Sequence, residues 1–321
     1  MRVIVTGGAG FIGSNLVDAL LARGDQVVAI DNFTTGRREF LEDGSTNPGL
    51  TIADVDIVGG AAELPRLFDF ADAVVHLAAN ADVRLGWNDP RRDLEQNVVG
   101  TLNVLDAMRA AGVDRLLFSS TGSVYGDCPI IPTTEDAPFP TQTSLYGASK
   151  AAAEGYIAAW TEAGLLSATV FRFVSILGPR YTHGHIIDFV AQLVKDPTVL
   201  HVLGDGTQRK SYLDVTDCVA ALISQLGERP KFDVMNLGID SECTVVDSVR
   251  WITGRMGLTP QVDFAGGRQG WIGDNPLILL DTTRVQATGW SPVFGIQEAV
   301  ERTVDYLMAN PWLLTEHDAE R

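Results

Sequence analysis

The stretch Met1-Arg-Val-Ile-Val-Thr-Gly-Gly-Ala-Gly-Phe-Ile-Gly13 decides the fold of this chain. It starts with a short apolar run, breaks into glycines at Gly7, Gly10 and Gly13, and continues with apolar residues at helical spacing up to Gly24. This pattern predicts a strand, a tight turn and a helix. Glycine is needed where the backbone has a positive φ or approaches a ligand too closely for a Cβ atom, and the free N–H groups of a helix start suit a pyrophosphate.

A second apolar run, from Gln26 to Ile30, ends on Asp31. An acidic residue at this distance from the glycines can accept hydrogen bonds from an adenosine ribose and would repel a 2′-phosphate, so the pattern favours NAD over NADP. The glycine spacing is G-x-x-G-x-x-G rather than G-x-G-x-x-G, and a strand-to-helix turn without a ligand is the alternative interpretation. The preceding strand, the following helix and Asp31 together favour dinucleotide binding.

The composition is that of an ordinary globular protein, with 321 residues of which 45% are hydrophobic and 20% charged. The net charge of -17 argues against non-specific nucleic-acid binding, so cations for an anionic ligand must be gathered locally. No apolar run could span a bilayer and Met1 enters a strand directly, so we expect a cytoplasmic protein without a signal peptide. The three cysteines lack C-x-x-C spacing, and we expect no metal site. The available cations are Arg84, Lys150, Arg172, Arg180, Arg209, Lys210 and Arg268.

Strand and helix patterns alternate through the first half of the chain. This alternation predicts an α/β fold of the Rossmann type, a doubly wound parallel sheet with helices on both faces. Further strands are predicted over 50–53, 73–79, 115–120, 168–174, 199–202 and 232–237, and helices over 90–111 and 145–160. We expect an NAD-binding domain over 1–176, with returning segments near 211–240, and a smaller α/β cap for the substrate over 177–321.

Chemistry is indicated by Ser119-Ser-Thr-Gly-Ser-Val-Tyr-Gly126 and by the later Tyr146-Gly-Ala-Ser-Lys150. On a helix, Tyr146 and Lys150 lie one turn apart on the same face, so the ammonium can lower the pKa of the phenol and help it act as a base. The hydroxyl of Thr121, at a strand end, could share a substrate hydroxyl with Tyr146. A half-buried tyrosine beside a solvated lysine is the alternative, and it would be preferred for an isolated Y-x-x-x-K.

Together these motifs resemble the nucleotide-sugar epimerase/dehydratase family of extended short-chain dehydrogenase/reductases. The resemblance covers nearly the whole chain, and it is more specific for the family than for the substrate. It is carried by residues 6–13, 31–33, 56–57, 76–79, 97, 120–121, 124–126, 146–150, 178–180 and 204–208.

The resemblance implies a 4-epimerase of the UDP-glucose/UDP-galactose type that holds NAD through its whole cycle. Tyr146 would take the proton of the C4 hydroxyl while hydride passes from C4 to NAD⁺, and the keto-sugar would turn over before the hydride returns. Thr121 would be the hydrogen-bonding partner, Lys150 would hold the nicotinamide ribose, and Asp56 and Ile57 would flank the adenine. The implied cofactor site is Gly7, Gly10, Phe11, Ile12, Gly13, Asp31, Asn32, Asp56, Ile57, Leu77, Ala78, Ala79, Asn97, Ser119, Tyr146 and Lys150. The implied substrate site is Asn80, Arg84, Thr121, Gly122, Ser123, Tyr146, Ser175, Arg180, Arg209, Lys210, Arg268 and Trp271.

The two residues that follow Thr121 differ from those of similar enzymes. Gly122 and Ser123 stand where similar dehydratases carry an Asp-Glu pair and decarboxylases a Glu. Without those carboxylates dehydration lacks its acid and base, so epimerisation is preferred. Ile278 stands where some of these epimerases have a large Tyr, and a smaller residue there could admit an N-acetyl group. A core isoleucine is the alternative interpretation.

The nucleotide side departs further, because Ser175 replaces an Asn, Arg209-Lys210-Ser211 replaces T-R-D, and Trp271 fills an arginine slot. Arg180, Arg209, Lys210 and Arg268 could still neutralise a pyrophosphate, and Trp271 could stack on a base or sugar. The nucleotide base therefore stays open.

The helices over 90–111 and 145–160 resemble those that pair in the family's dimer, so a homodimer is expected, although their apolar stripes could equally be internal core. Another reaction of the family stays open: dehydration, keto-sugar reduction or epimerisation at another carbon. A non-catalytic dinucleotide-sensing protein is a remote alternative, because it would not need Thr121, Tyr146 and Lys150.

Overall fold

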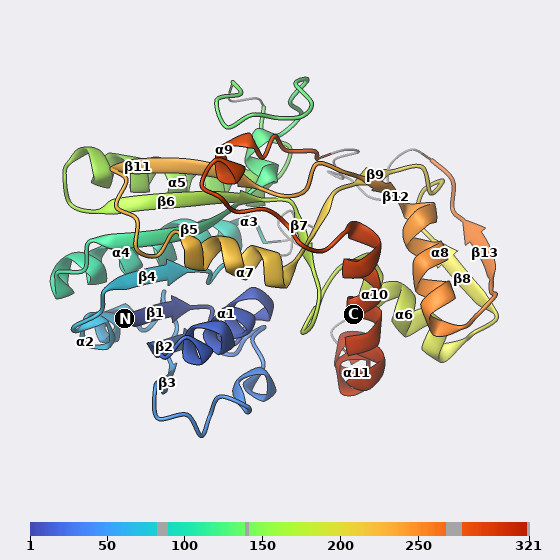
Figure 1. Ribbon diagram of the computed structural model, residues 1–321, viewed down its shortest axis with the longest axis horizontal. Coiled ribbons are helices and arrows are strands. Elements are labelled where there is room, and N and C mark those ends of the chain that lie inside the picture. The colour runs from blue at the N-terminus through green and yellow to red at the C-terminus, as the bar shows by residue number, and fades with distance from the viewer. Residues whose placement is uncertain (82–88, 139–140, 268–277, 320–321) are drawn as a thin grey trace.

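The main sheet of the computed structural model has seven strands, all parallel (Figure 1). The structure describes residues 1–81, 89–138, 141–267 and 278–319, with side chains as far as residue 315. In sheet order the strands are β11 (Phe232–Leu237), β6 (Ser167–Phe173), β5 (Arg115–Thr121), β4 (Ala73–His76), β1 (Arg2–Thr6), β2 (Gln26–Asp31) and β3 (Leu50–Asp54). This is the doubly wound, Rossmann-type arrangement that the sequence predicts.

The strand order changes direction between β1 and β4, which are neighbours although β2 and β3 lie between them in sequence. Ligands of open parallel sheets bind at such a switch point, beyond the carboxyl ends of the strands. The last residues of the two strands, Thr6 and His76, are paired in register, and both are buried. The loops that follow them therefore border the predicted ligand site.

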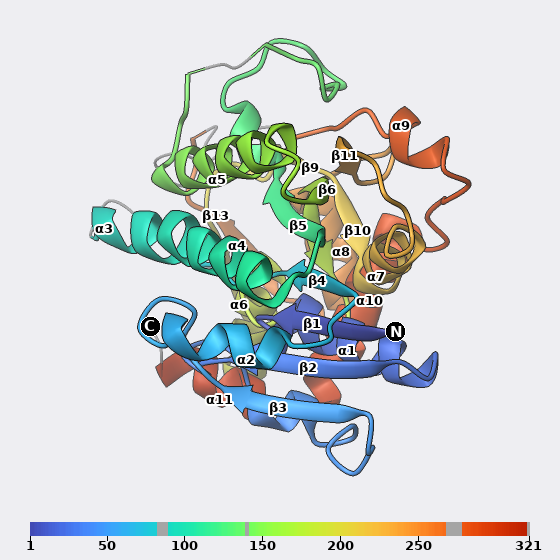
Figure 2. The same cartoon turned by 90° about the vertical axis from the view of Figure 1, so that its left-hand side faces the viewer.

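Helices cover both faces of the sheet (Figure 2). One face carries α1 (Phe11–Ala22) and α7 (Val215–Ser224), which contact each other, and the other carries α2 (Leu64–Phe68), α4 (Gly100–Ala111) and α5 (Leu145–Glu162). Val3 and Val5 of β1 belong to the apolar cluster on the α1 side, and Ile4 belongs to the cluster on the α4 side. A strand that is buried on both faces has a continuous apolar run, as β1 does.

Most of the C-terminal elements lie to one side of the main sheet, at the right in Figure 1. The helices after α7 are α8 (Val245–Met256), α9 (Thr283–Gln286), α10 (Ile296–Ala309) and α11 (Trp312–Ala319), and α6 (His185–Lys195) precedes it. The short strands are β7 (Ser175–Leu177) with β10 (Tyr212–Asp214), β9 (Arg209–Lys210) with β12 (Cys243–Thr244), and β8 (Val199–Val202) with β13 (Gln261–Phe264). Single 3₁₀ turns span Arg38–Leu41, Ala61–Glu63 and Gly122–Tyr125. Among the described residues, no helix combines the length and the apolar character that crossing a membrane requires.

The helix predicted over 90–111 is interrupted, because α3 (Pro90–Asp93) leads into a π-helix over Leu94–Val99 before α4 begins. Helical spacing predicts an apolar stripe through Leu94, Val98, Leu102, Leu105 and Met108. The first half of this stripe is wrong, because Leu94 is 52% exposed and Asp93 and Asn97 are buried instead. A π-helix accommodates an extra residue in a turn and so rotates the faces that precede it relative to those that follow. The strand predicted over 73–79 also ends earlier, at His76.

Candidate active site

The glycine-rich turn joins β1 to α1. Gly7 has a φ of +69°, and a Cβ atom at Gly13 would lie 2.0 Å from the Gly7 carbonyl oxygen, so the turn itself requires both glycines. A Cβ atom at Gly10 would meet only that same oxygen, at 3.2 Å, among the described residues. No side chain of the described chain caps α1, and no acidic residue lies in its first turn. The N–H groups of Phe11 and Ile12 at this uncapped helix start therefore fit the diphosphate of a dinucleotide.

The carboxylate of Asp31 lies beside this turn, at the end of β2. Its Oδ2 atom accepts the N–H of Ala9 at 2.9 Å and its Oδ1 atom accepts the N–H of Phe33 at 2.9 Å. Burial raises the pKa of Asp31, and these two hydrogen bonds act against that effect. A carboxylate has roughly four acceptor sites, so capacity remains for ribose hydroxyls. Asn32 is exposed and its side chain accepts the N–H of Thr34 at 3.1 Å.

The two residues expected to flank the adenine follow β3. Asp56 is partly exposed, and its Oδ1 atom accepts the N–H of Val58 at 2.9 Å. Ile57 is buried against α4, where a Cβ atom at Gly100 would lie 2.7 Å from its Cδ1 atom. Asp56 is therefore accessible to a ligand, whereas Ile57 mainly holds the loop against α4.

The loop after β4 touches the glycine-rich turn, because a Cβ atom at Gly7 would lie 2.7 Å from the nitrogen of Ala78. The Ala78 N–H donates to Oγ1 of Thr6 at 3.3 Å. The same Oγ1 atom lies 2.7 Å from Nδ1 of His76, whose Nε2 atom lies 3.0 Å from Oγ1 of Thr101. Burial and the charge of Lys150 lower the pKa of His76 to about 3, so this imidazole is neutral. The half-buried Leu77, Ala78 and Ala79 thus line the switch point as expected.

A buried polar network fixes the end of this loop to the π-helix. The Asn80 N–H donates to Oδ1 of Asn97 at 2.8 Å, and Nδ2 of Asn97 donates to the Asn80 carbonyl oxygen at 3.2 Å and to Oγ of Ser149 at 2.9 Å. The side chain of Asn80 donates to Oδ1 of Asp93 at 2.8 Å. Asn97 is 0% exposed, so its amide positions Asn80 instead of facing a ligand. Sequence reasoning did not identify Asp93 or Ser149.

The catalytic candidates Thr121 and Tyr146 come together, because the Thr121 hydroxyl acts to lower the pKa of the Tyr146 phenol. Thr121 ends β5, Tyr146 lies in the first turn of α5, and Ser144 caps that helix by accepting the Gly147 N–H at 3.0 Å. The prediction that the phenol has a lowered pKa is wrong for this structure, since burial and, to a smaller extent, the charge of Asp93 raise the pKa of Tyr146 to about 12. The Thr121 hydroxyl acts in the opposite direction but does not offset the burial.

Lys150 lies one turn after Tyr146, as predicted, and is only 2% exposed. Its Nζ atom donates to the carbonyl oxygen of Ser119 at 2.7 Å and lies 4.6 Å from the ring centroid of Phe118. Burial lowers the pKa of Lys150 to about 7, and the charge of Glu154 opposes this shift. The alternative of a solvated surface lysine is therefore wrong.

Two of the cations expected at the diphosphate are engaged by carboxylates of this chain. Nη2 of Arg180 lies 2.7 Å from Oδ2 of Asp18 in α1, and Arg209 forms an ion pair with Glu242. Lys210 pairs with Cys243 in the β9–β12 ladder, and Ser175 is exposed at the start of β7. Arg84, Arg268 and Trp271 lie outside the described residues. The geometry of Arg180 thus favours a role in anchoring its loop to α1.

The family is decided by comparison with known proteins. The model of the NAD dependent epimerase/dehydratase family matches residues 3–238. The chain belongs to this family. A UDP-glucose 4-epimerase of Mycolicibacterium smegmatis is 34% identical over 313 residues, which cover 95% of this chain and 98% of that protein. A Thermus thermophilus UDP-glucose 4-epimerase, solved in complex with NAD, is 33% identical with a TM-score of 0.84, covering 97% of this chain and 100% of that one. UDP-glucuronic acid decarboxylase 4 of Arabidopsis thaliana is 33% identical over 94% of this chain and 67% of that protein.

Gly122, which follows the candidate Thr121 in this member of the epimerase/dehydratase family, is tightly enclosed. A Cβ atom at Gly122 would lie 2.8 Å from Cγ2 of Ile278 and 3.3 Å from the carbonyl oxygen of Phe173. Ile278 therefore borders the loop that carries Thr121. Ser123 donates its N–H to Oγ1 of Thr121 at 3.1 Å, and its hydroxyl accepts from Thr121 at 3.2 Å.

A buried ion pair beneath this epimerase/dehydratase site was missed by sequence reasoning. Nη2 of Arg172 lies 2.7 Å from Oε2 of Glu154, and Nη1 of Arg172 donates to the Tyr125 hydroxyl at 2.8 Å. The Tyr125 hydroxyl donates in turn to Oδ1 of Asn236 at 2.7 Å. Arg172 is only 6% exposed, so it is not one of the cations available to a ligand. The signal that could have found the pair is the spacing of Glu154, one helical turn after Lys150.

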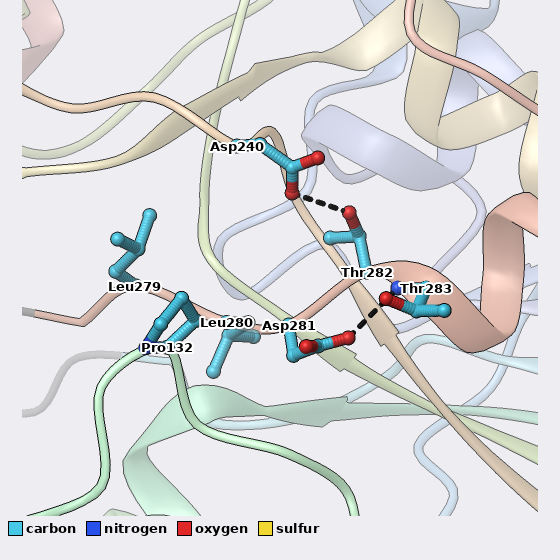
Figure 3. A pocket seen from close by; sticks show the side chains of 7 residues that line it. All are labelled: Pro132, Asp240, Leu279, Leu280, Asp281, Thr282 and Thr283. Atoms are coloured by element: carbon cyan, nitrogen blue, oxygen red, sulfur yellow. Dashed lines mark hydrogen bonds between the residues drawn. The ribbon is translucent and has the colours of Figure 1, made fainter.

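A small pocket lined mostly by the residues that follow Ile278 in sequence offers no second site for a nucleotide sugar (Figure 3). It is lined by Pro132, Asp240, Leu279, Leu280, Asp281, Thr282 and Thr283. Its two carboxylates are already engaged, since Oδ1 of Asp240 accepts from Oγ1 of Thr282 at 2.6 Å and Oδ1 of Asp281 accepts the Thr283 N–H at 2.9 Å. An anionic ligand would be repelled by these carboxylates.

Proposed function

We propose that this protein is an NAD-dependent nucleotide-sugar 4-epimerase acting on UDP-sugars. The observation that carries the proposal is that Thr121 at the end of β5 and Tyr146 act on each other beside the buried Lys150, whose Nζ atom donates to the Ser119 carbonyl oxygen. The relatives named UDP-glucose 4-epimerase cover nearly the whole chain and support the same activity.

In this proposal the chain's own residues move one proton and hold the sugar. Tyr146 exchanges a proton with the C4 oxygen, and Thr121 orients that oxygen through its hydroxyl. In this proposal the charged form of Lys150, one helical turn from Tyr146, would favour the phenolate that forms when the proton leaves. Bound NAD would supply the acceptor and the donor of the C4 hydride. The turn at Gly7, Gly10 and Gly13 and the carboxylate of Asp31 would hold it through a whole cycle.

Enclosure of Gly122 favours epimerisation over loss of water. An acidic side chain at this position would need the space that Ile278 and the Phe173 carbonyl group occupy. Ser123 is the next residue, and a hydroxyl is a poor substitute for the carboxylates that elimination requires. Whether the smaller Ile278 admits an N-acetyl group at C2 is part of the experiment below. We assign nucleotide-sugar binding to residues 177–321, apart from segments near 211–240 that return to the NAD-binding domain over 1–176.

We further propose a cytoplasmic homodimer that pairs through α4, its preceding π-helix and α5. These helices contact each other and lie on one outer face of the molecule (Figure 2). Leu94, Val99 and Tyr156 on them are 52%, 38% and 47% exposed, which is unusual for large apolar residues on one face. A two-fold partner that covers them would bury this apolar area.

The experiment that tests the activity uses the purified protein without added cofactor. It is incubated with UDP-glucose, UDP-galactose, their N-acetyl forms and UDP-glucuronate, and the sugar is followed by proton NMR. Formation of a C4 epimer supports both the reaction and the retained NAD⁺, and the relative rates report the role of Ile278. Unchanged substrates in a protein that contains NAD would refute the 4-epimerase assignment for these sugars and leave the cofactor assignment standing.

A further inference from the structure

Three side chains of α5 meet three consecutive residues of β5. The Thr121 hydroxyl acts on the Tyr146 phenol, Nζ of Lys150 donates to the Ser119 carbonyl oxygen, and the hydroxyl of Ser120 donates to Oε1 of Glu154. The three helical residues are spaced four apart and so lie on one face of the helix. Glu154 is therefore the third member of the row that contains both residues of the proposed acid–base pair.

The carboxylate of Glu154 is fixed in place by Arg172 of β6. The guanidinium reaches both oxygens, with Nη2 at 2.7 Å from Oε2 and Nε at 3.1 Å from Oε1. Nη1 of Arg172 donates instead to the Tyr125 hydroxyl at 2.8 Å and to the carbonyl oxygen of Glu135 at 3.1 Å. Glu154 is 5% exposed, so water does not screen its charge.

Among the described residues, Glu154 is the carboxylate whose charge raises the pKa of Lys150. From β4, His76 faces the ammonium and is neutral, because its pKa is lowered to about 3. From α3, Asp93 acts on Tyr146, and from β6, Arg172 is paired with Glu154. From the turn after β5, burial raises the pKa of Tyr125 to about 12, so it is neutral too.

We propose that Glu154 is a positioning residue of the active site, whose fixed carboxylate keeps the buried Lys150 ammonium charged and α5 in register with the end of β5. This inference rests on the proposed function, in which a charged Lys150 beside Tyr146 is required. Glu154 acts through Lys150 and touches no reacting atom. Burial lowers the pKa of Lys150 to about 7, so the opposing charge of Glu154 decides how much ammonium is present near neutral pH.

The test measures the protonation of Lys150 directly. The chain has only four lysines, Lys150, Lys195, Lys210 and Lys231, so the ε-carbon NMR signals of ¹³C-labelled lysine can be followed with pH. The Lys150 signal is assigned with Lys150→Met. In Glu154→Gln we expect the pKa of Lys150 to fall by about one unit or more, because an attraction is lost and the charge of Arg172 is no longer balanced. In Arg172→Gln we expect the opposite, a rise.

The control is Glu162→Gln, the same substitution on the same helix. Glu162 forms only a surface ion pair with Lys231, at 2.7 Å with both side chains more than half exposed. It should leave the Lys150 signal unchanged. If Glu154→Gln does not fold because Arg172 is left unpaired, Arg172→Gln and the neutral double variant Glu154→Gln/Arg172→Gln carry the test. The double variant should titrate between the two single variants.

Activity gives a second readout. In Glu154→Gln the alkaline limb of kcat should move to lower pH. For each pH unit by which the pKa of Lys150 falls, kcat well above that pKa should drop about tenfold, and KM should change little. Glu154→Asp, which keeps the charge, should recover part of the loss. Lost stability in both single variants with the Lys150 pKa at its wild-type value would overturn the proposal, since the pair would then be structural only. An inactive wild-type protein would instead refute the proposed function, and the NMR titration would still decide the role of Glu154.

Discussion

The ammonium of Lys150 and the carbonyl oxygen of Ser119 are 2.7 Å apart in a place that excludes water. Because burial lowers the pKa of Lys150 to about 7, the folded protein binds fewer protons than the unfolded chain between pH 7 and the ordinary pKa of 10.5. Stability rises with pH wherever the unfolded state binds more protons, so Lys150 makes unfolding harder as pH increases through this window.

The first prediction follows from that sign. The free energy of unfolding of wild type relative to Lys150→Met should increase from about pH 7 to about pH 10.5, by up to about 1.4 kcal/mol for each pH unit. Urea unfolding of both proteins at several pH values measures this difference. A difference that does not change with pH would show that Lys150 keeps its ordinary pKa.

The second prediction concerns the proposed acid–base residue. Tyr146→Phe removes the proposed acid–base hydroxyl and should reduce epimerisation by about 10²-fold to 10⁴-fold. The ring is kept, so the fold and the NAD content of the purified protein should match wild type. Circular dichroism and the absorbance of released cofactor provide these controls, and near-full activity would show that another group moves the proton.

The third prediction separates the hydroxyl of Thr121 from its methyl group. Thr121→Val should lose about tenfold to a hundredfold in kcat, because the proposed hydrogen bond to the reacting oxygen is removed, and with it the effect of the hydroxyl that lowers the pKa of Tyr146. Thr121→Ser keeps the hydroxyl and serves as the matched control. Equal rates in the two variants would argue against a role for the hydroxyl.

The fourth prediction tests the enclosure of Gly122. Gly122→Ala should destabilise the protein by about 1–3 kcal/mol, since its Cβ atom would lie 2.8 Å from Ile278. Gly155→Ala in α5 meets no atom within 4 Å and should stabilise by about 0.5–1 kcal/mol. Adding Ile278→Ala to Gly122→Ala should recover part of the loss in urea unfolding. No recovery would mean that the contact with the Phe173 carbonyl group dominates.

The fifth prediction addresses the dimer. Leu94→Glu combined with Tyr156→Glu should convert the proposed dimer to a monomer in light scattering after size exclusion, because charge would be placed in the apolar contact. Val293→Glu, at a residue that is 80% exposed on another part of the surface, is the control. An unchanged mass in the double variant would place the contact elsewhere.

The sheet and its switch point were predictable because both depend on local patterns. The glycines after β1 and the apolar run before Asp31 are contiguous in sequence, and the helical spacing of Tyr146 and Lys150 places them on one face. The buried state of Lys150 was not predictable, since it depends on β5 and on Phe118, which lie far away in sequence. The pKa of Tyr146 is raised and not lowered for the same reason, because burial is a property of the packed structure.

The π-helix over Leu94–Val99, which interrupts the helix predicted over 90–111, could not be predicted from the sequence pattern either. An apolar stripe indicates which residues could face a core, but it does not show that the polar pair Asp93 and Asn97 is buried instead. That choice is made by Asn80 and Ser149, which supply hydrogen bonds that the buried side chains of Asp93 and Asn97 need. The partners of Arg180 and Arg209 likewise came from distant segments.

The hydrogen bond between Tyr125 and Asn236 joins residues 111 positions apart. Asn236 also donates to the carbonyl oxygens of Thr133 and Asp281, so three distant segments meet at one amide. During synthesis on the ribosome, the strand that carries Thr121 emerges long before Asn236 does. A nascent chain can therefore form the glycine-rich turn early, but it cannot complete the surroundings of Tyr125 and Arg172 until most of the polypeptide has been made.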